Sequence, residues 1–137
     1  MKIIRNVIVK QVLTSKKRAT ILKKLEEEAQ KYNREIKQLT FLLHKAIRDS
    51  GSKHEEEEIR ARYMKDIKQR EASLESVTFQ IQQMDKLELG TEILEGTVES
   101  FIEIHEGDRW PGIESRQEIV VKDGIVQEIR ESRNDDD

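Results

Sequence analysis

Hydrophobic residues recur every three to four positions through two long segments, one on each side of Gly51. In the first, apolar or aromatic residues occupy heptad positions a and d from Leu22 to Ala46. The second keeps this spacing from Arg60 to Met84, with arginine at two positions. A heptad repeat sustained over four heptads is typical of a helix that packs against another helix. The pattern therefore predicts two long helices.

The two repeats are in register for an antiparallel hairpin. In that arrangement position a of one helix lies opposite position d of the other, so the numbers of paired residues add to a constant. All the pairs add to 106: Leu22–Met84, Leu25–Ile81, Ala29–Val77, Tyr32–Leu74, Ile36–Arg70, Leu39–Ile67, Leu43–Tyr63 and Ala46–Arg60. We therefore predict an antiparallel coiled-coil hairpin over residues 14–89, with arms of about 50 Å.

The midpoint of this register falls at a sequence that favours a bend, near residues 50–53. Gly51 suits a left-handed residue just after the first helix. Ser52 and Glu55 have the spacing of a capping box, with Ser52 as the N-cap of the second helix. Glu55, Glu56, Glu57 and Glu58 follow in its first turns, where the helix dipole favours anions.

Some residues depart from a simple two-stranded seam. Arg70 occupies a d position, where its stem packs and its head reaches water, or where it forms a buried ion pair. Apolar residues also fall outside a and d, at flanking or outward positions: Leu42 and Ile59 at g, Ile47 and Met64 at e, Phe41 and Phe79 at f. They indicate either better local packing or an oligomer or partner surface.

The segments that flank the helices are typical of strands. Residues 2–12 are rich in Ile and Val, and residues 97–105 alternate between two faces. Residues 118–129 form a hairpin signal, because Asp123-Gly124 supplies the positive φ angles of a type I′ turn. We expect residues 1–13 and 90–131 to form one small sheet or barrel, in which the N-terminal strand joins the C-terminal hairpin. Residues 132–137 are expected to be a disordered acidic tail.

The fold class is therefore α+β, with the hairpin inserted between strands of the small β module. Composition agrees with an extended surface, because 39% of the 137 residues are charged and only 35% are hydrophobic. There is no cysteine. We expect a cytoplasmic protein, because no run of apolar residues is long enough for a transmembrane helix and the N-terminus does not resemble a signal peptide.

The two ends of the chain differ in charge. Residues 1–25 contain eight basic residues and no acid, whereas residues 88–137 contain fifteen acids and five bases. Cross-strand pairs of Lys2, Arg5 and Lys10 with glutamates 99, 103, 118 and 128 would explain this without a ligand. The other explanation is a charged partner.

Several motifs together resemble the bacterial YlqD family over nearly the whole chain. They are Ile3-Ile4, the run from Val7 to Thr14, Leu89-Gly90-Thr91-Glu92, Gly107-Asp108-Arg109-Trp110 and the run from Glu118 to Gly124. The resemblance implies a cytosolic bacterial protein. The genes of this family often lie beside ribosome-maturation and tRNA-methylation genes, which implies a link to RNA or the ribosome. It implies no active-site residues.

The sequence contains no pattern that predicts catalysis, a metal ion or a cofactor. His44 falls at an outward position of the first helix. His54 beside Glu55–Glu58 lacks the spacing of metal ligands, and His105 with Asp108 lacks a nucleophile. No phosphate-binding glycine loop is present. An enzyme is therefore the least expected class.

Three roles remain open from the sequence. The first is a non-enzymatic interaction or scaffold protein that self-associates, as a dimer or tetramer, through the surplus apolar residues. The second is an RNA-binding or ribosome-maturation factor that docks through the basic residues at the base of the hairpin: Lys16, Lys17, Arg18, Lys23 and Lys24. The third is a factor whose acidic hairpin tip, Glu55–Glu58, contacts a protein partner, by analogy of shape with transcription-cleavage and holdase proteins.

Overall fold

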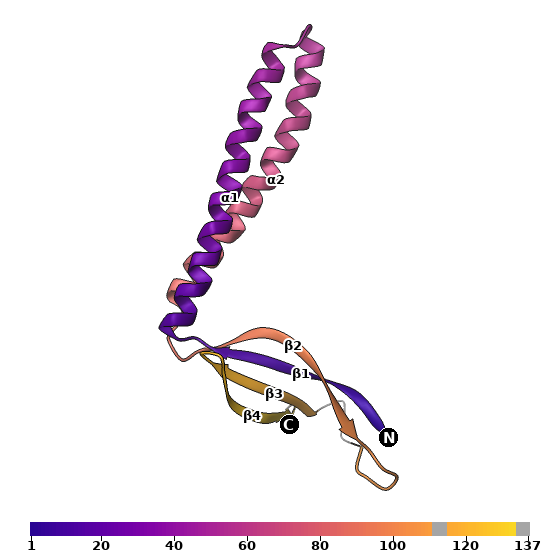
Figure 1. Ribbon diagram of the computed structural model, residues 1–137. Coiled ribbons are helices and arrows are strands. Elements are labelled where there is room, and N and C mark those ends of the chain that lie inside the picture. The colour runs from indigo at the N-terminus through magenta and orange to yellow at the C-terminus, as the bar shows by residue number, and fades with distance from the viewer. Residues whose placement is uncertain (111–114, 134–137) are drawn as a thin grey trace. The chain divides into compact units, whose positions relative to one another are not determined.

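Figure 1 shows a computed structural model of the chain. It describes the backbone of residues 1–110 and 115–133 and the side chains of residues 1–110 and 117–131. Contacts divide the chain into two units. The β unit consists of Met1–Arg18 with Glu88–Asp137, and the hairpin unit of Ala19–Leu87. The fold class is α+β, as predicted, with a helical hairpin inserted between strands of one mixed sheet.

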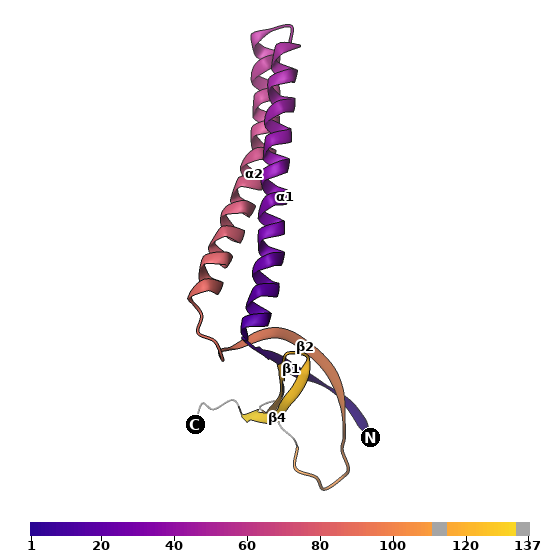
Figure 2. The same ribbon diagram turned by 60° about the vertical axis from the view of Figure 1, so that its left-hand side comes forward.

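The hairpin consists of α1 (Ser15–Arg48) and α2 (Lys53–Lys86), each 34 residues long. The two helices run side by side in both views (Figures 1 and 2). Residues at the expected a and d positions are buried or half-buried, with the exception of Arg60, which is exposed. The apolar stripe of each helix therefore faces the other helix of the hairpin.

The turn between the helices has the expected cap but not the expected glycine conformation. The Ser52 side chain accepts a hydrogen bond from the Glu55 N–H at 3.1 Å, and the Glu55 carboxylate accepts one from the Gly51 N–H at 3.1 Å. The prediction that Gly51 is left-handed is wrong, because its φ is not among the positive ones. Instead, the Ile47 carbonyl accepts bonds from both the N–H and the hydroxyl of Ser50, at 3.1 and 2.6 Å, which closes the end of α1.

The best-packed part of the hairpin lies toward this turn. Its buried centre is Leu43, Ile59 and Ile67, surrounded by half-buried side chains: Ile36, Leu39, Ala46, Ile47, Tyr63 and Met64. Ile59, expected at a flanking g position, is only 9% exposed. The hairpin core therefore includes three of the six apolar residues expected outside positions a and d, namely Ile47, Ile59 and Met64, in agreement with local packing. The other three, Phe41, Leu42 and Phe79, are exposed.

The β unit contains a four-stranded sheet in the order β2-β1-β3-β4. The strands are β1 (Lys2–Val12), β2 (Glu92–Glu103), β3 (Ser115–Lys122) and β4 (Ile125–Arg133). β1 is antiparallel to β2 and parallel to β3, and β3 is antiparallel to β4. The expected pairing of the N-terminal strand with the C-terminal hairpin is therefore confirmed, and β2 and β4 are the edge strands.

Two strand boundaries differ from the expectation. β2 begins at Glu92 rather than at residue 97, because the strand continues through Gly96 with a bulge opposite Val9 and Lys10. β4 extends to Arg133, so two residues of the expected tail belong to the sheet, while residues 134–137 lie outside the described part. Asp123 and Gly124 have φ angles of 48° and 81°, the positive values predicted for the turn.

The conformation of Gly51 leads to a test of the turn. A Cβ at this position would meet only the Glu55 Oε2 atom, at 3.6 Å, which is an ordinary contact. We expect Gly51→Ala to leave the free energy of unfolding unchanged or to raise it by about 0.4–1 kcal/mol, because alanine restricts the unfolded chain. Urea unfolding monitored by circular dichroism at 222 nm measures this. Gly90→Ala, at a φ of 93°, is the control expected to destabilise. A loss of 1 kcal/mol or more for Gly51→Ala would show that the residue is left-handed after all.

Candidate functional site

The register of the sheet assigns each side chain to one of its two faces, and apolar side chains occur on both: Ile4, Leu94, Phe101 and Ile125 share the face that carries the buried charges. One face, here called the charged face, carries Lys10, Glu92, Glu118 and Arg130, one residue from each strand. The other, here called the apolar face, carries eight neighbouring apolar side chains: Val7, Val9, Ile93, Val98, Ile119, Val121, Val126 and Ile129.

Glu118 is the centre of the charged face and is only 6% exposed. Its Oε1 lies 3.2 Å from Lys10 Nζ, and its Oε2 accepts a hydrogen bond of 2.9 Å from Arg130 Nε. Arg130 also donates to both carboxylate oxygens of Glu92, one of them at 3.2 Å. This network links side chains of all the strands, including the two edge strands.

The network explains how a carboxylate can be buried in this sheet. The hydrogen bond from Arg130 lowers the pKa of Glu118 below its ordinary value of 4.5; burial opposes this shift, and Lys10 reinforces it. The carboxylates of Glu92 and Glu118 in turn raise the pKa of Arg130. Because both oxygens of Glu118 are engaged by cations, the arrangement joins strands and does not present a free acid or base for catalysis.

The apolar face is different, because side chains on its two edge strands remain in contact with solvent, whereas Val7 at its centre is buried. Val98 and Val126 are about half exposed, and Ile129 is 69% exposed. The charged residues that the register places on this face are Arg5 and Glu131. A contiguous apolar area on four strands is typical of a surface that another protein covers.

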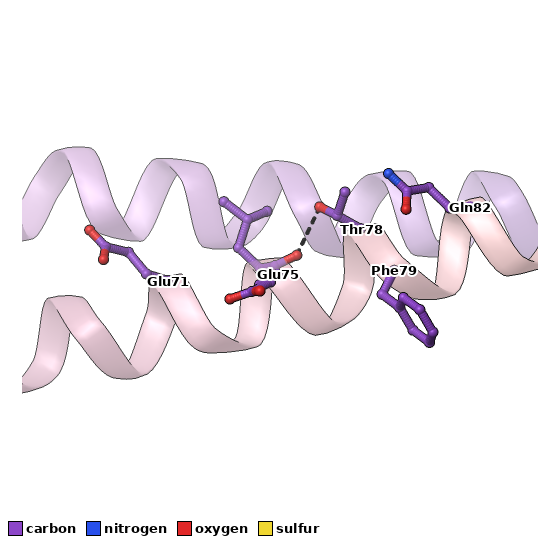
Figure 3. A pocket seen from close by; sticks show the side chains of 6 residues that line it. Glu71, Glu75, Thr78, Phe79 and Gln82 are labelled. Carbon is purple, nitrogen blue, oxygen red and sulfur yellow. Dashed lines mark hydrogen bonds between the residues drawn. The ribbon is translucent and has the colours of Figure 1, made fainter.

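The exposed apolar residues of the hairpin are scattered in comparison. Phe41 and Leu42 lie on α1, and Phe79 lies on α2. Phe79 lines an open groove of about 480 Å³. In Figure 3 its ring projects away from α1. The groove is lined by residues of α2 only: Glu71, Leu74, Glu75, Thr78, Phe79 and Gln82. The Thr78 hydroxyl donates a hydrogen bond to the Leu74 carbonyl of the same helix.

The five basic residues expected to contact RNA do not form one patch. Lys17 lies 3.8 Å from Glu95 of β2, and Arg18 is half-buried. Arg18 is also about 200° around α1 from Lys16, so the two point to different sides of the helix. Lys16, Lys23 and Lys24 are exposed on a common side.

Most glutamates at the hairpin tip have local partners. Glu55 caps the turn, Glu56 lies 3.4 Å from Arg60, and Glu58 lies 3.2 Å from His54. Glu57 is exposed. These contacts are the ones expected of an acidic first turn of a helix.

Arg70 combines the two expected alternatives. It is half-buried in the seam, and its Nε lies 3.6 Å from Glu35 Oε2 on α1. The ion pair joins the two helices at a partly exposed position, which makes its contribution to stability small.

Glu92 and Arg130 were not predicted from the sequence as partners of Glu118. The alternation of β2 and β4 was visible, but the partners depend on which strands the sheet brings together. In the described part of the chain, no three histidine or acidic side chains converge as metal ligands. None of its helices is long and apolar enough to cross a membrane.

These features define an α+β protein in which a helical hairpin is inserted into a mixed four-stranded sheet. A family model described as "YlqD protein" matches residues 1–130. A Bacillus subtilis (strain 168) protein named "Uncharacterized protein YlqD" is 35% identical over 131 residues, which cover 96% of this chain and 99% of the relative. The chain therefore belongs to the YlqD family.

A solved structure shows the same fold. It is a crystal structure of a protein of unknown function from Synechococcus sp. WH 8102, with a TM-score of 0.70. The likeness covers 95% of this chain and 94% of the other, at 21% sequence identity. At this identity, the likeness supports only the arrangement of helices and strands.

The buried network predicts how the β unit responds to pH. The lowered pKa of Glu118 stabilises the folded state above the ordinary pKa of 4.5, and this stabilisation is lost as the pH falls through the folded value. We expect Glu118→Gln to lower the free energy of unfolding by about 1–3 kcal/mol at neutral pH. The difference from the wild type should shrink as the pH falls well below 4.5.

Hydrogen exchange of the strand amides in increasing denaturant reports on the β unit. Glu99→Gln is the matched control, because Glu99 is an exposed carboxylate on β2. Equal stability of the two variants at neutral pH would contradict a stabilising role of the network.

Proposed function

We propose that this YlqD-family protein is a non-enzymatic, cytoplasmic interaction protein that self-associates. The hairpin acts as a two-stranded antiparallel coiled coil that closes on itself, and the apolar face of the sheet is the surface that a second copy covers. The observation that carries this proposal is the contiguous set of apolar side chains on that face, with Val98, Val126 and Ile129 exposed. The proposed contact between copies therefore lies on the sheet, and not on the flank of the hairpin as expected from the sequence.

A second copy suits the apolar face because the face is nearly free of charge. Two copies packed face to face bring apolar side chains together and avoid the like charges of the other face. Strand spacing and rise give an area of roughly 500 Å² per copy. The total is at the low end for specific interfaces, which favours a weak, concentration-dependent dimer.

Two edge residues of β4 test this directly. Ile129 is 69% exposed on the apolar face, and Ile125 is 71% exposed on the charged face. We expect Ile129→Lys to abolish the dimer and Ile125→Lys to leave it intact, because only the first places a charge in the contact. Sedimentation velocity across the micromolar range measures the association, and circular dichroism verifies that both variants fold.

A wild-type protein that stays monomeric throughout this range would refute self-association. Equal effects of the two variants would place the contact elsewhere. The other candidate is an RNA-binding factor that docks through Lys16, Lys17, Arg18, Lys23 and Lys24. Of these residues, Lys16, Lys23 and Lys24 are exposed on a common side of α1, whereas Arg18 is half-buried and Lys17 lies near Glu95.

A further inference from the structure

The side of α1 that points away from α2 is strongly basic along its whole length. The helix positions b, c and f between residues 23 and 48 include seven basic residues: Lys23, Lys24, Lys31, Arg34, Lys37, Lys45 and Arg48. All seven are exposed, and Glu27 is the one acid among these positions. They span 25 residues of a single helix, or about 37 Å. We call these seven residues the basic stripe.

The basic stripe is specific to α1. The corresponding positions of α2 carry four bases and three acids: Arg62, Lys65, Lys68 and Lys86 with Glu55, Glu58 and Glu75. The chain as a whole has a net charge of −3. A helix surface that served only to make the hairpin soluble would not need its bases gathered on one side of α1, because interspersed acids and bases also provide solubility.

The basic stripe is not neutralised within the described part of the chain. None of its seven members forms an ion pair with an acidic side chain there. Glu27 is the one acid of α1 among the stripe positions, and the other acids lie at the flanks, with Glu26 at position e and Glu28 and Glu35 at position g. The positive surface is therefore narrow, about the width of one helix, and straight.

We propose that the basic stripe binds a nucleic acid through its phosphate backbone. A linear row of phosphates matches a narrow, straight row of exposed cations. A flat anionic membrane fits less well, because it would also meet the glutamates at the flanks, and the outward side of α1 offers Phe41 as its one large apolar side chain. Binding is independent of base sequence, because the stripe lacks the aromatic residues that stack on bases.

This inference does not rest on self-association, since the basic stripe and the apolar face belong to different units of the chain. The two proposals therefore succeed or fail separately. A monomeric protein would still present the basic stripe.

Fluorescence anisotropy with a labelled single-stranded RNA of mixed sequence tests the proposal. We expect the full-length protein to bind, with an affinity that falls as salt rises from about 50 to 200 mM. Seven phosphate contacts predict a slope of roughly −5 for the logarithm of the association constant against that of the salt concentration.

A matched pair of variants identifies the surface. Lys31→Gln, Arg34→Gln and Lys37→Gln together remove the centre of the basic stripe, at positions c, f and b of α1. Arg62→Gln, Lys65→Gln and Lys68→Gln remove three exposed bases at the same positions and spacing on α2. Both triple variants change the net charge equally, and circular dichroism verifies that each is helical.

The α1 variant should bind about 100-fold more weakly at 0.1 M salt, with a slope less steep by about 2. The α2 variant should bind within a few-fold of the wild type. Absence of RNA binding at low salt would overturn the proposal, as would equal losses in the two variants, which indicate a general effect of net charge. Binding to phosphatidylserine vesicles without binding to RNA would assign the basic stripe to a membrane instead.

Discussion

β1 forms backbone hydrogen bonds with two strands, β2 and β3, that both come after the hairpin in the chain. The sheet can therefore form only if the long helical segment returns the chain to its starting point. Leu13 and Gly90 show this closure: the Leu13 N–H donates to the Thr91 carbonyl, and the Gly90 N–H donates to the Leu13 carbonyl, both at 2.8 Å. Two helices of equal length satisfy the requirement, because an antiparallel pair ends where it began. An unstructured connection of this length would carry a larger entropy cost of closure.

The two units use their apolar residues differently. In the hairpin, Leu43, Ile59 and Ile67 are buried between the two helices, and even residues at flanking positions contribute to this core. In the sheet, an apolar face spans four strands while Ile129 at its edge remains exposed. The hydrophobic effect acts on both surfaces, but the sheet buries Val7 while it leaves Val98, Val126 and Ile129 of the same face exposed. This contrast is the physical basis for placing a protein contact on the sheet.

The two units also differ in whether their charged side chains are buried. Glu118 is buried, and it is accompanied by Lys10 and Arg130, because an unpaired carboxylate would be costly there. The basic stripe of α1 is exposed, so its cations need no partner and repel one another only weakly in water. An anion that lies along the basic stripe would be attracted by several of these cations at once.

The hydrophobic period predicted the helical hairpin, and the spacing of Ser52 and Glu55 predicted the cap, because each of these depends on residues close in sequence or on one repeating interval. The same holds for the strand of residues 2–12 and for the turn at Asp123 and Gly124. Sequence reasoning placed Gly51 in the wrong conformation, because Ser50 closes α1 in a way that glycine statistics do not reveal. It also left open whether Ile47, Ile59 and Met64 pack locally.

Only the tertiary structure decided which side chains meet across the sheet. Glu92 is 38 residues from Arg130 in the sequence, and the strand order and the register bring them together. Arg130 lies opposite Glu118 within the β3–β4 hairpin because the register shifts between Val120 and Val121. The apolar face has the same origin, since strand alternation shows two faces but not which residues of four strands become neighbours. Local pattern specifies each element here, and long-range pairing specifies the surfaces that the elements form together.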